Sequence, residues 1–87
     1  MFNFTRAALQ LEKAEKCAAA IRSEELTASH LAKAEKLIMG VTFNMSETRA
    51  LISMYDRVLT AAANLDEKIP IKQHCQEMKQ LLQASMI

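Results

Sequence analysis

The stretch SEELTASHL, residues 23–31, decides whether the first half of this chain forms one helix or two. Before it, apolar residues recur every three or four positions, a spacing typical of the buried face of a helix: Phe4, Ala7, Leu11, Ala14, Ala18 and Ile21. The next apolar series is one residue out of that frame: Leu31, Ala34, Ile38 and Val41. A break explains the slip, because Thr27 is a suitable N-cap and Leu26 and Leu31 occupy the positions of a hydrophobic staple. One continuous helix to about residue 39 stays open as the alternative.

The segments on either side of this stretch resemble each other: LEKAEKCAAAI is residues 11–21, and LAKAEKLIMGV is residues 31–41. Helical-hairpin repeats need about 33 to 47 residues per unit, which is longer than the spacing between these two copies. No third copy follows. We interpret the segments as two sides of one hairpin, in which small residues allow close packing and the KAEK centres face solvent.

The second half of the chain carries its own helix boundaries. Gly40 is suited to end a helix in the left-handed conformation, and Asn44 followed by Glu47 forms a capping box, with Ser46 as a competing cap. Pro70 ends the third helix. The predicted fold is all-α, a compact antiparallel four-helix bundle with helices at about 3–22, 27–40, 44–65 and 71–85. A chain of 87 residues forms a single domain, residues 1–87.

Composition excludes several classes of function. The chain has 11 Lys and Arg interleaved with 10 Asp and Glu, so its net charge of +1 offers no sustained attraction to nucleic acid. It has no apolar run long enough for a membrane span, and its two cysteines are too few for a disulfide-stabilised secreted scaffold. We therefore expect a cytoplasmic protein with reduced thiols and no membrane partner.

The residues that could carry catalysis or bind a metal are few. Cys17, His30, His74 and Cys75 show neither the spacing of a helical metal site nor that of a local nucleophile and base. Both histidines are expected to be solvated or to cap helices. A chain with one glycine also has no phosphate-binding loop. The sequence predicts no cofactor, no metal and no enzymatic activity.

DNA binding is an alternative, because residues 31–51 superficially resemble a helix-turn-helix with Gly40 in its turn. Arg49 and Arg57 would then be the DNA-binding residues. The resemblance is incomplete, since Lys36 stands where the motif needs a small buried residue and the turn is too long. Nucleic acid is therefore an unlikely partner.

The segment LIMGVTFNMS, residues 37–46, holds more apolar residues than one helix face needs. Either Phe43 and Met45 cap the core, or the segment forms an exposed, adaptable surface of the kind that binds proteins. Phe2 and Phe4 pose the same choice. The candidate protein-binding residues are Met39, Val41, Phe43, Met45, Phe2 and Phe4.

The predicted function is that of a small protein-binding regulator, inhibitor or adaptor of the kind that phages and plasmids encode. A secretion or assembly co-chaperone is a further alternative. Self-association would bury surplus apolar surface, and a symmetric homodimer would be its default form.

Overall fold

The computed structural model describes residues 2–66 and 68–86, and within them the chain forms a bundle of four α-helices. The helices are α1 (Phe2–Lys16), α2 (Glu24–Ile38), α3 (Met45–Ala62) and α4 (Ile71–Ala84), and a π-helical turn, η1 (Cys17–Ile21), extends α1. The predicted all-α bundle is confirmed. Its Cα radius of gyration is 12.0 Å, which is about the value expected for a compact domain of this length.

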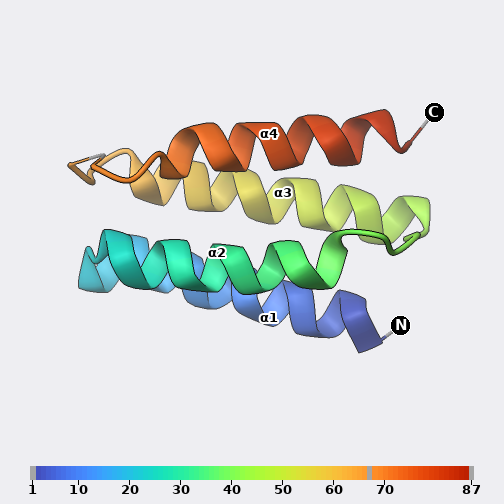
Figure 1. Ribbon diagram of the computed structural model, residues 1–87, viewed down its shortest axis with the longest axis horizontal. Coiled ribbons are helices and arrows are strands. Elements are labelled where there is room, and N and C mark those ends of the chain that lie inside the picture. The colour runs from blue at the N-terminus through green and yellow to red at the C-terminus, as the bar shows by residue number, and fades with distance from the viewer. Residues whose placement is uncertain (1, 67, 87) are drawn as a thin grey trace.

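The bundle consists of two helical hairpins, α1 with α2 and α3 with α4 (Figure 1). Within each hairpin the helices are antiparallel. Between hairpins, α1 packs on α3 and α2 on α4, and these neighbours run parallel because direction alternates along the chain. The contact between α2 and α4 is the least extensive of the four. The two hairpins therefore meet mainly through α1 and α3.

The first hairpin turns at Arg22 and Ser23, so the alternative of one continuous helix is wrong. Arg22 adopts the left-handed conformation (φ 58°, ψ 39°), and the amide of Ser23 donates to the carbonyl of Cys17 at 3.1 Å. The amide of Arg22 donates to the same carbonyl, and this bond between residues five apart is the hydrogen bond of a π-helix. The Ser23 side chain then caps α2 by accepting from the amide of Leu26.

Three predictions about this part of the chain are wrong. Thr27 is not the N-cap: it lies one turn inside α2, fully buried, and its hydroxyl donates to the carbonyl of Ser23 at 2.7 Å. The staple does not form either, because Leu26 is 46% exposed. Ile21 also leaves the predicted buried face and is 61% exposed, since the wider π turn rotates it away from the core.

The predicted boundaries of the second connection are confirmed. Gly40 follows the end of α2 with φ 78°, a conformation that favours glycine. Asn44 accepts from the amide of Glu47 at 2.7 Å, and the Glu47 carboxylate accepts from the amide of Asn44 at 3.2 Å. The two caps hold residues 39–44 as a fixed connection between α2 and α3.

The third connection brings the two hairpins together at the opposite end. Glu24, in the first turn of α2, accepts from the amide of Ile69 at 2.9 Å, one residue before Pro70. The core runs the length of the bundle. Its largest fully buried side chains come from all four helices: Tyr55, Leu11, Leu31, Leu51, Val58, Thr27 and Cys75.

Candidate functional site

Four exposed apolar side chains gather at the end of the bundle where α2 passes into α3. Met39 is 50% exposed, Val41 37% and Met45 52%, and Leu81 in the last turns of α4 is 48% exposed. We call Met39, Val41, Met45 and Leu81 the apolar end surface. Met39, Val41 and Met45 lie within seven residues of one another, and the fold brings Leu81 of α4 to the same end of the bundle (Figure 1).

The apolar end surface borders a hollow of about 310 Å³ between residues 38–43 and the end of α4. Met39, Val41 and Leu81 line it, and buried Ile38 and Leu82 lie at its base. Met39 ends α2 with an extended ψ of 131° and Gly40 follows in the left-handed conformation, so the chain leaves the helix axis and Met39 and Val41 lie beside the end of α4. The result is a concave surface with a firm base and flexible methionine at its edge.

The phenylalanine candidates differ from the other four residues. Phe43 and Phe4 are partly buried and pack against the hydrophobic core, as the core-capping interpretation predicts. The side chain of Phe2 lies outside the described part of the structure. Met45, which the same interpretation also placed on the core, is instead exposed. Phe43 thus anchors the connection while its neighbours face solvent.

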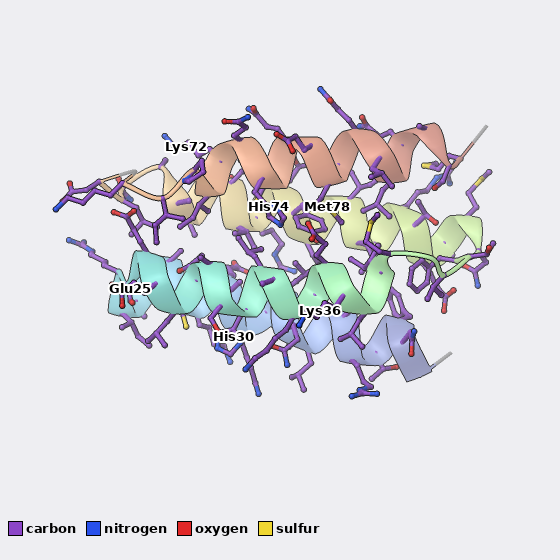
Figure 2. The ribbon with its side chains drawn as sticks, in the orientation of Figure 1. Glu25, His30, Lys36, Lys72, His74 and Met78 are labelled. Carbon is purple, nitrogen blue, oxygen red and sulfur yellow. The ribbon has the colours of Figure 1, made fainter. Side chains whose placement is uncertain are left out.

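A second candidate is a groove of about 230 Å³ between α2 and α4. Its walls are largely apolar, and it also contains Glu35 and His74. Figure 2 shows His74 on the side of α4 that faces α2, with Met78 beside it. The His74 Nε2 atom lies 3.6 Å from Glu35 Oε1, too far for a hydrogen bond but within reach of an ion pair when the imidazole is protonated.

Two buried side chains, Tyr55 and Cys75, lie close to this pair. The Tyr55 hydroxyl is buried and has no hydrogen-bond partner among the described residues. The His74 Nε2 atom also has no hydrogen-bond partner among them. Burial raises the pKa of Tyr55 well above its usual value of 10.0, and Cys75 and Glu35 contribute to the shift. Burial also raises the pKa of the Cys75 thiol to about 12. The Tyr55 and Cys75 side chains are therefore neutral at physiological pH, and Cys75 is not an activated nucleophile.

The other residues considered from sequence lie apart from one another. His30 bridges α1 and α2, with Nδ1 2.8 Å from Gln10 Oε1, and burial followed by Lys33 and Lys13 lowers its pKa. His30 and His74 are both partly exposed, and each also lies beside a side chain of a neighbouring helix, Gln10 and Glu35 respectively. Within residues 2–66 and 68–86, no group of three or more His, Cys, Asp or Glu side chains has the geometry to hold a metal ion.

The two arginines of the DNA-binding alternative are both exposed on α3. Arg57 forms an ion pair with Glu15 of α1, with Nε 3.6 Å from Oε1. Helix α3 itself packs on both α1 and α4 and buries five residues: Thr48, Leu51, Tyr55, Val58 and Ala62.

Leu81 and the pairing of Glu35 with His74 were not identified from the sequence. In the sequence, Leu81 is an extra apolar residue beside the buried face of α4. It follows Met45 by 36 residues, so no local pattern indicates that the two lie at the same end of the bundle. Glu35 belongs to the KAEK segment, which we expected to face solvent. Only the packing of α2 on α4 shows that one side of that segment borders a groove.

No protein-family model, no curated protein and no solved structure matches this chain. None of the helices in the described part of the chain is long and apolar enough to cross a membrane. The geometry of the two candidate sites is therefore the basis for a functional proposal.

Proposed function

We propose that this protein is a small non-enzymatic regulator or adaptor that binds another protein through the apolar end surface. The observation that carries the proposal is the exposure of Met39, Val41 and Leu81 around one hollow, with Met45 exposed at the same end of the bundle (Figure 1). Single exposed apolar residues are common on soluble proteins, whereas several around a concavity are typical of a binding surface.

The architecture supports binding by a surface that exists before the partner arrives. Gly40 and the Asn44–Glu47 capping box fix both ends of the connection, and Phe43 anchors its middle in the core. A surface held in this way loses little conformational entropy on binding. The methionine side chains remain adaptable and can adjust to the partner.

The groove between α2 and α4 is a weaker candidate for the main binding site. It is smaller than most ligand sites, which enclose about 300–1,000 Å³, and its polar groups already face each other across the two helices. We assign the Glu35–His74 pair to the contact between the hairpins.

The proposal is tested by placing a photo-cross-linking amino acid at Val41 in cells that carry the gene. We expect a specific adduct with another protein. Met39→Asp should reduce that adduct about tenfold or more, because a carboxylate at a desolvated apolar contact costs several kcal/mol. The circular dichroism spectrum and melting temperature should change little, since Met39 is half exposed.

Leu26→Asp is the matched control. Leu26 lies in the first turn of α2 and is 46% exposed, close to the exposure of Met39. It is at the end of the bundle opposite the apolar end surface (Figure 1). It should leave the Val41 adduct intact. The proposal fails if Val41 gives no adduct, or if Met39→Asp and Leu26→Asp reduce it equally. A large loss of melting temperature in Met39→Asp would instead show that this residue belongs to the core.

A further inference from the structure

Basic residues outnumber acidic residues at the tip of the bundle that carries the apolar end surface. The segments that form this end of the bundle are residues 2–11, 36–53 and 79–86 (Figure 1). They contain four basic residues, Arg6, Lys36, Arg49 and Lys79, and one acidic residue, Glu47. Glu12, Glu35, Asp56 and Glu77 lie one to three residues beyond these bounds, so the excess of positive charge is confined to the tip of the bundle.

The one carboxylate here is already engaged, since Glu47 accepts from the amide of Asn44 in the capping box. Lys79 is likewise paired with Asp56 of α3. In contrast, the side chains of Lys36 and Arg49 are exposed and form no ion pair with any described residue. They are also within four residues of Met39 and Met45 in the chain.

Both cations are close to it in the chain. Lys36 precedes Met39, the C-cap residue of α2, by three residues, and Arg49 follows Met45 by four residues in α3, so Arg49 and Met45 share one helix face. Figure 2 shows Lys36 on an outer part of α2. Helix dipoles do not oppose this field, because the ends of alternating helices largely cancel one another at the end of a bundle.

We infer that the partner presents an acidic amphipathic segment to this end, with bulky aliphatic side chains for the hollow and Asp or Glu side chains for Lys36 and Arg49. This inference rests on the proposed function. It follows from charge complementarity, which fixes orientation and excludes partners of the wrong sign. Anionic membranes are disfavoured as the occupant, since their recognition generally uses about four to eight basic residues and Lys79, one of the four at this end, is already paired with Asp56.

The inference is tested with two synthetic amphipathic peptides of about 15 residues, a length at which isolated helices become stable. Both carry leucine on one face. One has glutamate and the other lysine at its flanks. In fluorescence anisotropy, the glutamate peptide should bind the full chain at least tenfold more tightly than the lysine peptide. Raising salt from about 0.01 M to 0.15 M shortens the Debye length from about 30 Å to 8 Å and should weaken that binding.

The variant Lys36→Glu with Arg49→Glu should reduce binding of the glutamate peptide about tenfold or more. Lys16→Glu with Lys68→Glu makes the same change of net charge at exposed sites elsewhere on the bundle and should have little effect. Equal binding of the two peptides, or no binding of either, overturns the inference. So does binding of phosphatidylglycerol-containing vesicles in place of the glutamate peptide.

The Val41 cross-link separates failure of this inference from failure of the proposed function. If Lys36→Glu with Arg49→Glu leaves the cellular adduct unchanged while Met39→Asp removes it, the protein binds a partner through this surface but the partner is not acidic. If neither Val41 nor its neighbours give an adduct, the proposed function itself is wrong.

Discussion

At the scale of the residue, Tyr55 is the most unusual feature of the core. It is fully buried, and its hydroxyl has no hydrogen-bond partner among the described residues. Leaving a buried hydroxyl unpaired costs about 1–3 kcal/mol. Tyr55→Phe removes that cost and keeps the ring, so we expect urea denaturation to show an unfolding free energy unchanged or raised by up to about 1 kcal/mol.

Tyr55→Leu is the control for this prediction, because it also removes the hydroxyl but leaves space where the ring packed. It should destabilise by about 1–3 kcal/mol. If Tyr55→Phe were destabilising by a similar amount, the hydroxyl would have to be hydrogen-bonded in solution.

At the scale of the element, the turn between η1 and α2 depends on a residue that is poorly suited to its backbone. The left-handed conformation of Arg22 costs a residue with a Cβ atom roughly 1–2 kcal/mol, and glycine avoids that cost. Part of the gain is offset by the greater entropy of glycine in the unfolded chain. We expect Arg22→Gly to raise the unfolding free energy by about 0.5–1 kcal/mol in urea denaturation.

Arg22→Ala distinguishes the backbone effect from loss of the side chain. Alanine keeps the Cβ atom and with it the unfavourable conformation, so its stability should stay close to that of the original protein. An equal gain in Arg22→Ala and Arg22→Gly would attribute the effect to the arginine side chain and contradict the prediction.

The two connections that flank α2 show what local sequence can and cannot predict. The Asn44–Glu47 box and the left-handed Gly40 were predictable, because each depends only on residues a few positions apart. The break near residue 23 was predictable from the shift in apolar frame, but its geometry was not. No glycine marks the left-handed position, and both Ser23 and Thr27 are residue types that cap helices, so tertiary burial of Thr27 decides between them.

At the scale of the whole molecule, the candidate site was predictable only where it is continuous in sequence. Met39, Val41 and Met45 lie within seven residues, and their surplus of apolar surface was visible without a structure. Leu81, the groove containing Glu35 and His74, and the excess of positive charge all depend on which helices become neighbours. Four short amphipathic helices allow several such arrangements, and apolar periodicity alone does not choose among them.

The buried Cys75 thiol and Tyr55 hydroxyl predict how the stability of the bundle changes at alkaline pH. Folding keeps the Cys75 thiol neutral up to about pH 12, whereas the unfolded chain releases this proton near its usual pKa of 9.0; Tyr55 is shifted in the same direction from 10.0. Above pH 9 the folded state therefore binds more protons than the unfolded state, so stability falls as pH rises. The slope approaches about 1.4 kcal/mol per pH unit for each fully titrating group.

Cys75→Ala isolates one of these groups. The substitution lowers stability at neutral pH by leaving a small cavity, but it should flatten the decline in unfolding free energy between about pH 8 and 10.5, measured by urea denaturation at several pH values. The change in slope is the decisive quantity, because a cavity acts equally at every pH whereas an ionisable thiol does not. Parallel slopes in the original protein and Cys75→Ala would show that water reaches Cys75 and that the core opens at this point before the bundle unfolds.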